Sequence, residues 1–434
     1  MSDAATPALS DPSPSAATSP ARGATVRFEH VTKRYESKEK GPGAVNDLTL
    51  DVPAGKICVL VGPSGCGKTT SLKMVNRLIE PTSGRILIDG QDIGRQDPIA
   101  LRRGIGYVIQ HTGLFPHQKV GDNVAVVPRL LGWDAKRRRE RTDELLTLVG
   151  LEPARYRDRY PSQLSGGERQ RVGVARALAA DPPVMLMDEP FGAVDPIVRE
   201  RLQNEFLRLQ EQLAKTILFV THDIDEAIKM GDLVAVMQRG GILAQFGSPD
   251  DILAKPASDF VARFVGADRG LKRLSLARVR DLQLLPVVTA REGTEAADAR
   301  ARVRADPFQY LLLVDAANRP IGWIDEETIP ADGRLTEAVA IPMSPLLDRR
   351  TTLKDALSMI IDAEVVAGIV VDRDGGVLGL VTAESIGAAM RDGVVSEAAI
   401  RNEPPDEAVD PDPEPGPAMT DDEAAGAGET SSRG

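Results

Sequence analysis

The alternation of apolar and polar positions predicts an α/β domain in the first half of the chain. Between residues 25 and 249, short runs of Val, Ile and Leu alternate with longer stretches in which apolar residues recur at helical spacing. Strands that alternate with helices in this way are typical of a largely parallel sheet whose crossover connections are helices. A further helical pattern over residues 250–275 predicts a linker to the rest of the chain.

The region after this linker contains an internal repeat. Residues 311–329 align without a gap to residues 368–386, so that Asp315 falls on Asp372, 57 residues further along the chain. Each copy has the pattern helix, strand, turn, strand and helix, which predicts a small α+β unit. We assign the two repeats to residues 276–330 and 335–395.

Composition sets the two ends of the chain apart from these folded regions. Residues 1–24 are rich in Ser, Pro and Ala, and residues 400–434 are dominated by Asp, Glu, Pro, Gly and Ala. Segments of this kind bury too little apolar surface to fold alone, so we expect both to be disordered. The acidic tail carries most of the excess negative charge of a chain whose net charge is −11.

Composition also indicates where the chain works. There is no apolar run of about 18 residues, as a membrane-spanning helix requires, and residues 1–24 lack the apolar stretch of a secretion signal. The two cysteines, Cys58 and Cys66, do not suggest a disulfide framework, which favours a reducing cytoplasm. The acidic charge balance argues against a nucleic-acid partner, because nucleic-acid-binding surfaces usually present a basic field.

The first candidate for chemistry is the loop Gly62-Pro-Ser-Gly-Cys-Gly-Lys-Thr69. A predicted strand runs into it and a helical pattern runs out of it, which is the context that a phosphate-binding loop requires. Backbone N–H groups at its glycines and the helix start attract phosphate, Lys68 reaches the terminal phosphates, and Thr69 offers its hydroxyl to Mg2+. We interpret Cys66 as a small residue that fits the loop rather than as a redox thiol. The predicted nucleotide-binding residues here are Gly62, Pro63, Ser64, Gly65, Cys66, Gly67, Lys68, Thr69 and Thr70.

A second candidate is the run from Val184 to Glu189, four apolar residues followed by two carboxylates. It predicts a buried parallel strand, and ligands of open α/β sheets bind at the carboxyl ends of the strands. Asp188 is then suited to hold Mg2+, and Glu189 to polarise the water that attacks the γ-phosphate. The alternative is a strand that ends at a surface turn, and the phosphate-binding loop in the same domain argues against it.

Between these motifs lies Leu164-Ser-Gly-Gly-Glu-Arg-Gln170, which opens a helical run. Ser165 and the N–H groups of Gly166 and Gly167 are suited to form a second anion site at a helix start. A phosphate-binding loop with this signature upstream of an apolar Asp-Glu strand resembles the ATP-binding-cassette (ABC) family. The resemblance implies a P-loop NTPase cassette with a RecA-like core and a helical subdomain. It also implies ATP and Mg2+ as ligands, ATP hydrolysis, and a homodimer, or a pair with another ATPase subunit, in which the signature faces the ATP of the opposite subunit.

The family resemblance extends to four single residues. Tyr35 resembles the aromatic residue that stacks on adenine, and Gln110 the glutamine that touches Mg2+ and reports on the membrane partner. Asp195 resembles the aspartate that crosses the dimer interface, and His222 the histidine that contacts the γ-phosphate and orients the attacking water. Taken alone, Tyr35 would more often be a surface residue, Gln110 would usually have no special role, and His222 would more often be structural. Their order and spacing favour the functional interpretation. The implied catalytic residues are Lys68, Gln110, Glu189 and His222, and the implied Mg2+ ligands are Thr69, Gln110 and Asp188.

Finer resemblance points to one group of importers. Residues 76–84 and 106–117 are similar to stretches of ATPases that energise uptake of glycine betaine, carnitine, choline and proline. Many members of that group carry a C-terminal pair of cystathionine-β-synthase-type (CBS) repeats, which the internal repeat resembles. The resemblance implies a transmembrane permease as partner, an indirect link to a solute-binding protein, and a peripheral position on the inner face of the cell membrane. An importer ATPase for another small solute, such as an amino acid, and a soluble non-transport ABC ATPase are the alternatives.

In many CBS pairs a Gly, two apolar residues, a hydroxyl residue and an Asp three positions later bind an adenine nucleotide. Residues 379–382 fit the opening of this pattern, but Ser385 stands at the acidic position. The first repeat has Asp325 and Thr328 at the two polar positions. These departures argue against nucleotide binding. A dimerisation module, and a sensor of ionic strength whose charged surfaces contact the membrane, are the alternatives.

Overall fold

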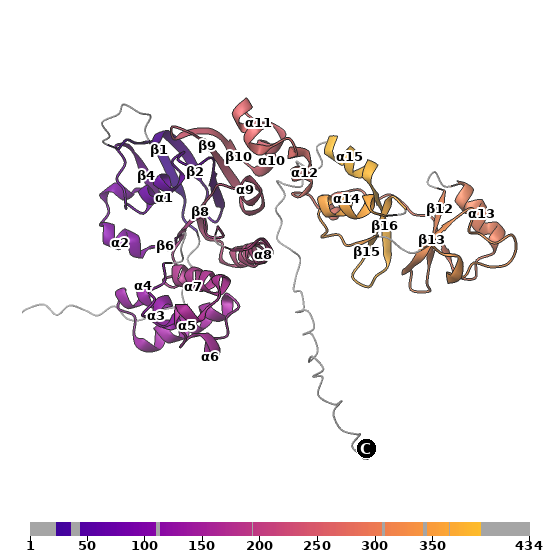
Figure 1. Cartoon of the computed structure of the whole chain (residues 1–434), viewed down its shortest axis with the longest axis horizontal. Helices are drawn as coiled ribbons and strands as arrows, with labels where there is room; N and C mark the ends of the chain where they lie inside the picture. The colour runs from indigo at the N-terminus through magenta and orange to yellow at the C-terminus, as the bar shows by residue number, and fades with distance from the viewer. Residues whose placement is uncertain are drawn as a thin grey trace, which may run out of the picture. The chain divides into compact units, whose positions relative to one another are not determined.

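A six-stranded sheet forms the centre of the first region of the chain (Figure 1). The computed structural model describes residues 23–35, 44–109, 113–192, 194–305, 309–341, 345–363 and 365–391. The strands of this sheet are β3 (Ile57–Val61), β6 (Ile105–Val108), β7 (Val184–Asp188), β8 (Thr216–Thr221), β9 (Leu233–Gln238) and β10 (Ile242–Gly247). They stand in the order β10-β9-β3-β8-β7-β6, and all neighbours are parallel except β10 and β9.

A second sheet, antiparallel, covers one face of the central sheet. It consists of β1 (Val26–Lys33), β2 (Val45–Val52), β4 (Ser83–Ile88) and β5 (Gln91–Asp92), in the order β2-β1-β4-β5. Cys58 and Leu60 of β3 pack with Phe28 of this sheet, whereas Val59 and Val61 pack in the other core, with the helices. Because both faces are covered, β3 is apolar at every position, as a buried parallel strand requires.

The helices of the first region fall into two sets. Those connected directly to the central sheet are α1 (Lys68–Val75), α2 (Pro98–Arg103), α8 (Pro196–Leu213) and α9 (Ile224–Met230). The others gather beside the strands, at the lower left of Figure 1. These are α3 (Val120–Val124), α4 (Val126–Leu130), α5 (Ala135–Leu148), α6 (Pro153–Tyr156), the 3-10 turn η2 (Pro161–Gln163) and α7 (Gly166–Leu178). A core with an attached helical group is the arrangement that the sequence predicts.

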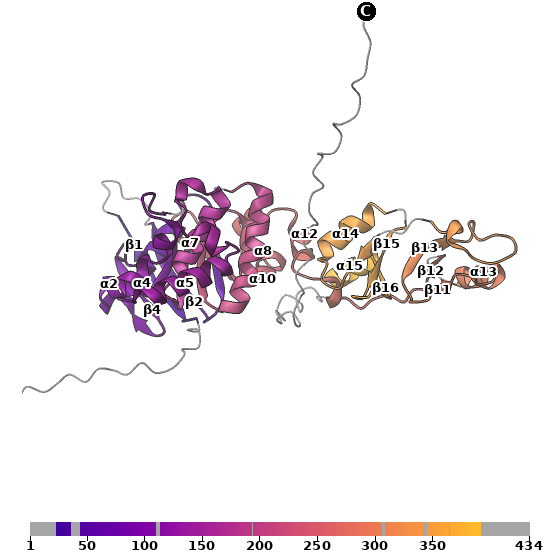
Figure 2. The ribbon, with the colours of Figure 1, turned by 90° about the horizontal axis from the view of Figure 1, so that it is seen from below.

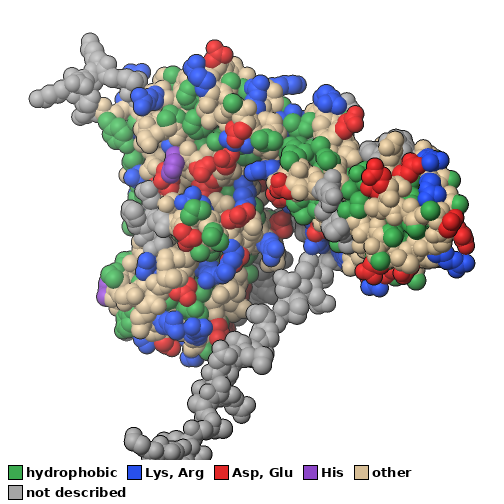
Figure 3. All heavy atoms as spheres, turned by 45° about the vertical axis from the view of Figure 1, so that its right-hand side comes forward, with side chains coloured by type: hydrophobic (Ala, Val, Ile, Leu, Met, Phe, Trp, Pro, Cys, Tyr) green, Lys and Arg blue, Asp and Glu red, His purple; other side chains and the backbone are tan. Residues whose placement is uncertain are grey.

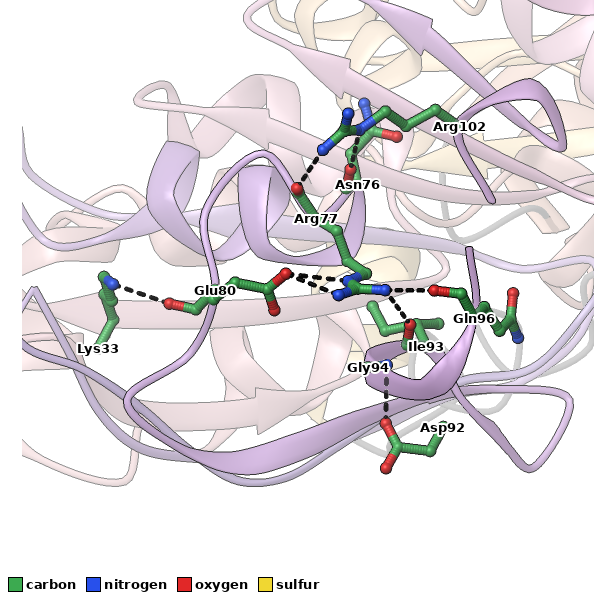
Figure 4. Close-up of polar contacts among 9 residues, drawn as sticks. All are labelled: Lys33, Asn76, Arg77, Glu80, Asp92, Ile93, Gly94, Gln96 and Arg102. Atoms are coloured by element: carbon green, nitrogen blue, oxygen red, sulfur yellow. Dashed lines mark hydrogen bonds and ion pairs between the residues drawn. The ribbon is translucent and has the colours of Figure 1, made fainter. Parts of the chain in front are cut away.

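Hydrogen bonds to backbone carbonyls anchor the end of α1 (Figure 4). The Arg77 guanidinium donates to carbonyl oxygens in and just after η1 (Ile93–Arg95), and it pairs with Glu80 at 2.9 Å. Arg102 of α2 donates to the carbonyl of Asn76 at 3.1 Å and to that of Arg77. The helix that begins at the phosphate-binding loop is therefore also fixed at its far end.

Three short helices form the expected helical linker, namely α10 (Pro249–Ala254), α11 (Asp259–Val265) and α12 (Arg269–Leu274). Ser248 and Ser258 cap the first two by accepting hydrogen bonds from backbone N–H groups three residues later. Arg273 pairs with the largely buried Asp250 at 2.9 Å, which joins α12 to α10. Neither these helices nor any other helix in the described ranges is long and apolar enough to cross a membrane.

The internal repeat forms two three-stranded sheets with the same pairing. The first contains β11 (Thr289–Arg291), β12 (Tyr310–Val314) and β13 (Pro320–Asp325), and the second β14 (Leu346–Leu347), β15 (Ala367–Val371) and β16 (Val377–Thr382). In each sheet the first pair of strands is parallel and the second antiparallel. Leu313 pairs with Gly322, and Val370 with Gly379, so the repeat of the sequence is preserved in the register.

The aligned aspartates hold the turns between the paired strands. Oδ1 of Asp315 accepts hydrogen bonds from the backbone N–H groups two and four residues later, both at 2.8 Å. Oδ1 of Asp372 does the same, at 2.9 and 2.8 Å. Asp favours turns because its short side chain can bond the backbone ahead of it. The repeated aspartate is thus explained by turn geometry.

The two repeats differ after their last strand. In the second, α14 (Leu353–Ile361) precedes β15 and α15 (Ala383–Arg391) follows β16, and the two helices pack together (Figures 1 and 2). In the first, α13 (Ala296–Ala305) precedes β12, but within residues 309–341 only the 3-10 turn η4 (Glu337–Val339) follows β13. Pro330 lies five residues after the strand, and proline stops a helix because it lacks an N–H group and its ring clashes with the preceding turn. The expectation of a closing helix is therefore correct for the second repeat and wrong for the first.

The charged side chains form a mixed surface. On the face drawn in Figure 3, Lys and Arg side chains lie among those of Asp and Glu. Exposed ion pairs such as Lys119–Asp158 at 2.9 Å and Arg302–Asp298 at 2.6 Å belong to this surface. Exposed pairs of this kind contribute little to stability because water and salt screen them, so the fold depends on its apolar cores.

Leu312 should be a stability determinant of the repeats, because it lies opposite Trp323 in an apolar cluster that both repeats share. Leu312→Ala leaves a cavity, so we expect the free energy of unfolding to fall by about 2–5 kcal/mol. In a Trp133→Phe background, Trp323 is the remaining one of two tryptophans, and its fluorescence in urea reports the unfolding of this region.

The matched control is Leu378→Ala, at a leucine of β16 that is 44% exposed. It should change the free energy of unfolding by less than about 0.5 kcal/mol. Equal effects of the two variants would contradict the assigned core.

Candidate functional site

Three parallel strands end at the same edge of the central sheet. Val61, the last residue of β3, pairs with Thr221, the last residue of β8, and β7 ends at Asp188 beside β8. The phosphate-binding loop, His222 and Glu189 follow these positions directly. Because carboxyl ends of neighbouring parallel strands share an edge, residues far apart in the sequence meet there.

Close backbone contacts fix the phosphate-binding loop between β3 and α1. Gly67 has φ +96°, and a Cβ at this residue would lie 2.1 Å from the carbonyl oxygen of Ala44. A Cβ on Gly62 would lie 2.1 Å from the carbonyl oxygen of Met237. Only glycine fits both positions. Cys66 is fully buried in the loop and burial raises the pKa of its thiol, which suits a structural residue rather than a reactive thiolate.

Lys68 is folded back over this loop. Its Nζ donates to the carbonyl oxygens of Gly62 at 2.7 Å and Pro63 at 3.1 Å, and the residue is only 6% exposed. Ser64 and Gly65 form the exposed tip of the loop. A phosphate oxygen would be a stronger partner than a carbonyl, because its negative charge adds Coulombic attraction to the ammonium. The ammonium is therefore held where a phosphate can replace its present partners.

Thr69 and Asp188 form the candidate Mg2+ site. The Thr69 hydroxyl donates to Oδ1 of Asp188 at 2.9 Å. Burial raises the pKa of the Asp188 carboxyl, and the negative charge of Glu189 adds to this effect, whereas the hydrogen bond from Thr69 opposes it. A hydroxyl and a carboxylate are oxygen donors of the kind that Mg2+ prefers, and this ion usually takes its other ligands from phosphate and water. The donor set fits Mg2+ that binds together with a nucleotide.

Glu189 leaves β7 with a strained backbone and approaches His222. Its φ is 45°, in the left-handed region that costs a non-glycine residue about 1–3 kcal/mol. Its N–H group donates to the carbonyl of Val220 at 2.9 Å, which holds this turn against β8. Oε1 of Glu189 lies 3.1 Å from Nδ1 of His222. A carboxylate beside an imidazole at the open edge of a sheet is suited to activate and orient a water molecule.

The signature helix α7 begins with a reciprocal cap. Oγ of Ser165 accepts a hydrogen bond from the N–H of Glu168 at 3.3 Å, and the Glu168 carboxylate accepts one from the N–H of Ser165 at 2.6 Å. The Tyr156 hydroxyl also donates to Glu168, and together these bonds lower the pKa of its carboxyl. A Cβ on Gly166 would meet no atom within 4 Å, so the helix start is open, and the next residue is Gly167. An exposed helix start of this kind attracts an anion.

The other predicted site residues lie on separate elements. Asp195 caps α8 by accepting from the N–H of Val198 at 3.1 Å. Tyr35 is 55% exposed, with Nζ of Lys33 5.3 Å from the centre of its ring, and Thr70 lies in the first turn of α1. Gln110 lies outside the described residues. At this edge of the sheet, Lys68 contacts the carbonyl of Gly62 in its own loop. Thr69 contacts Asp188, and Glu189 contacts His222.

The polar positions compared with the CBS nucleotide pattern are used in local caps. In the second repeat, the N–H of Thr382 donates to Oγ of Ser385 at 3.0 Å, and the N–H of Ser385 donates to Oγ1 of Thr382 at 3.1 Å. Asp325 and Thr328 form the same reciprocal pair in the first repeat, at 3.2 and 2.7 Å. These side chains therefore have backbone partners within their own turns.

Sequence analysis missed one buried carboxyl near the site. Glu226 lies on α9, one helical turn after His222, and accepts a hydrogen bond from Gln203 of α8 at 3.0 Å. The available signal was its position next to the apolar residues Ala227 and Ile228. That signal is weak, because a short helix does not reveal from sequence which of its faces is buried.

Comparisons with known proteins agree with this geometry. A family model for ABC transporters matches residues 45–192, and a CBS domain model matches residues 337–392. The chain is 46% identical over 352 residues to the osmoprotectant import ATP-binding protein OsmV of Salmonella typhimurium, covering 81% of this chain and 92% of that protein. It is 45% identical over 365 residues to the glycine betaine/carnitine/choline transport ATP-binding protein OpuCA of Bacillus subtilis, covering 83% and 95%. The choline transport ATP-binding protein OpuBA of Bacillus subtilis is 44% identical, with the same two coverages.

These matches confirm the predicted fold class, a P-loop NTPase cassette followed by CBS-type α+β repeats. The alignments are longer than the cassette and therefore extend into the repeats. Identity of this level over most of both chains shows common descent and a shared ATPase architecture. The chain belongs to the ATP-hydrolysing, ATP-binding subunits of the ABC transporter family.

Proposed function

We propose that this chain energises the import of an osmoprotectant such as glycine betaine, carnitine, choline or proline. The relatives that it matches over most of their length are named for the import of osmoprotectants or for the transport of glycine betaine, carnitine and choline. The observation that carries the ATPase part of the proposal is the shared edge of β3, β7 and β8. The contacts Thr69–Asp188 at 2.9 Å and Glu189–His222 at 3.1 Å there support ATP hydrolysis.

In the proposed reaction, each residue at this edge has one task. Lys68 exchanges its hydrogen bonds to loop carbonyl oxygens for hydrogen bonds to phosphate oxygens. The N–H groups of the loop and of the first turn of α1 bind the same phosphates. Thr69, Asp188 and Gln110 hold Mg2+, which neutralises phosphate charge when it is bound. Glu189 accepts the proton of the attacking water, and His222 hydrogen-bonds the γ-phosphate. Most of the catalysis comes from position and charge, as is usual in phosphoryl transfer.

We further propose that two copies close head to tail on two ATP molecules. In this dimer, Ser165, Gly166 and Gly167 bind the ATP held by the partner, Asp195 crosses the interface, and Tyr35 stacks on adenine in its own protomer. The open start of α7 supports this arrangement.

The proposed partners lie at the membrane. A transmembrane permease binds the solute and takes up the motion of the closing dimer, and a solute-binding protein acts through that permease. The chain itself then works in the cytoplasm, peripheral to the inner face of the membrane. Of the open roles for the CBS repeats, dimerisation and ionic-strength sensing at the membrane agree better with the capped polar positions than nucleotide binding does.

Glu189→Gln should leave ATP binding intact and lower the rate of hydrolysis by about a hundredfold to ten-thousandfold, the usual contribution of a general base. The variant should also accumulate as a closed dimer with MgATP, because only the group that activates water is lost. Size-exclusion chromatography and a phosphate-release assay measure the two effects. Glu211→Gln, at an exposed position of α8, serves as control. Wild-type turnover by Glu189→Gln would exclude the assigned role.

Asp188→Asn should raise the melting temperature of the nucleotide-free protein at neutral pH by a few degrees. Burial holds the pKa of Asp188 above its unfolded value, so ionisation destabilises the fold, increasingly as the pH rises from the unfolded pKa through the folded one. The gain should shrink as the pH falls toward the unfolded pKa. The same variant should lose the additional stabilisation that MgATP gives over ATP alone. Thermal melts with each addition test both points, and a lower melting temperature without nucleotide would contradict them.

A Lys68→Ala allele should abolish the accumulation of labelled glycine betaine at high salt in the organism that encodes this chain. The lysine is needed to hold the phosphates, so the permease then lacks its energy source. Uptake by the unaltered strain at high and low salt is the comparison. If the Lys68→Ala strain accumulates as much betaine as the unaltered strain but fails to take up an amino acid, the proposed substrate class is wrong.

A further inference from the structure

The buried carboxyl of Glu226 has no task in the mechanism above, yet it lies between two segments of the site. The residue is 9% exposed on α9, and Gln203, which donates to it at 3.0 Å, is 5% exposed on α8 (Figure 1). One helix follows His222 and the other follows Asp195. Glu226 therefore links α9 to α8, the two helices that follow segments expected to contact ATP.

On one side, Glu226 fixes the turn that carries His222. Its backbone N–H donates to Oδ1 of Asp223, the residue after His222, at 3.3 Å, and the Thr221 side chain lowers the pKa of its carboxyl. Oγ1 of Thr221 in turn accepts from the N–H of Asp223 at 3.1 Å, and Asp223 caps α9. The residues on both sides of His222 and the backbone of Glu226 are thus joined by hydrogen bonds within one turn.

On the other side, Glu226 faces the segment that carries Asp195. Arg199 attracts the Glu226 carboxylate and donates to the carbonyl of Val194, the residue before Asp195, at 2.9 Å. Arg199 and Gln203 follow Asp195 at intervals of four residues, so all three lie along one face of α8. The start of this helix and the carboxyl are therefore in one network.

The chemistry of this carboxyl argues for a role in position rather than in packing. Burial and the charge of Asp223 raise the pKa of Glu226, while the Thr221 side chain, the hydrogen bond from Gln203 and the charge of Arg199 oppose that rise. An apolar side chain would fill the same space without the cost of desolvating a charge. What it would lack is the buried acceptor that binds Gln203 of α8 beside the His222 turn.

We propose that Glu226 is a positioning residue for ATP hydrolysis, which ties the Asp195 segment to the turn of His222 and so keeps the imidazole beside Glu189. This inference rests on the proposed function, because it assumes that His222 acts on the γ-phosphate. Movement of Asp195 on dimer closure would then reach His222 of the same protomer through Arg199, Gln203 and Glu226.

The test compares full-length variants by ATPase kinetics and by NMR of labelled histidine. Glu226→Ala should lower kcat about tenfold to a hundredfold, the cost of a catalytic group displaced by about 1 Å. The KM for ATP should stay within about twofold, because the phosphate-binding residues are untouched. The chain has four histidines, so the His222 signal can be identified by its loss in His222→Ala, and it should shift in Glu226→Ala. Glu226→Gln, which keeps an acceptor for Gln203, should recover part of the rate.

The matched control is Glu200→Gln. Glu200 pairs with Lys229 at 3.6 Å and so also joins α8 to α9, but on the exposed side, where its side chain is 73% exposed. This variant should leave kcat and the His222 signal unchanged. Should Glu226→Ala fail to fold, Glu226→Gln takes its place, and it must lower kcat and shift the signal relative to Glu200→Gln.

Two results overturn the inference. One is a folded Glu226 variant whose kcat is within about twofold of wild type. The other is a fall in kcat with an unmoved His222 signal, which would indicate a general structural effect. Failure of the proposed function is distinguishable, because it would appear as normal turnover in His222→Ala. An inactive His222→Ala beside a fully active Glu226→Ala would reject only the present inference.

Discussion

The parallel alignment of β3, β8 and β7 is the constraint on which the site depends. It brings the positions after Val61, Asp188 and Thr221 to one edge, where a loop lysine, two acids and a histidine meet. The opposite edge is closed by Lys215, which is fully buried and paired with Asp181 at 2.7 Å. A buried ion pair contributes little net stability, but it tolerates few alternative arrangements, because a displaced charge would be left without a partner. The candidate catalytic residues thus lie at one end of the strands, and the buried Lys215–Asp181 pair lies at the other.

Two backbone positions near the ends of the central strands have positive φ values, which strain Glu189 and require glycine at residue 67. Glu189 leaves β7 in the left-handed region, and Gly67 begins α1 with φ +96° against the backbone of Ala44. Strain of this kind persists only where the surroundings determine the backbone fully. Here the hydrogen bond from the Glu189 N–H to the Val220 carbonyl of β8 supports Glu189. The hydrogen bonds of Arg77 hold the far end of α1. The turn of Glu189 and the helix after the phosphate-binding loop are therefore held in place by contacts with the surrounding backbone.

The repeats use similar local chemistry for another purpose. Asp315 and Asp372 hold equivalent turns, and the polar residues after each second strand bond to each other's backbone. A shared apolar cluster that includes Trp323 and Leu380 joins the two copies. Their polar side chains are thus used within the fold. This arrangement agrees better with a module that packs against another surface than with a nucleotide site.

The sequence alone determined the fold class, because glycine spacing, the lysine beside it and apolar runs that end in acids are local requirements of a phosphate-binding sheet. It also showed the 57-residue repeat, since the turn aspartates repeat with it. The sequence-based prediction of a helix after β13 was wrong, because Pro330 interrupts the helical pattern there. Only the tertiary structure revealed that Glu226 accepts a hydrogen bond from Gln203 of another helix. Contacts between residues on different elements leave no periodic trace in the chain, because they depend on which helix faces pack together rather than on the order of residues within either helix.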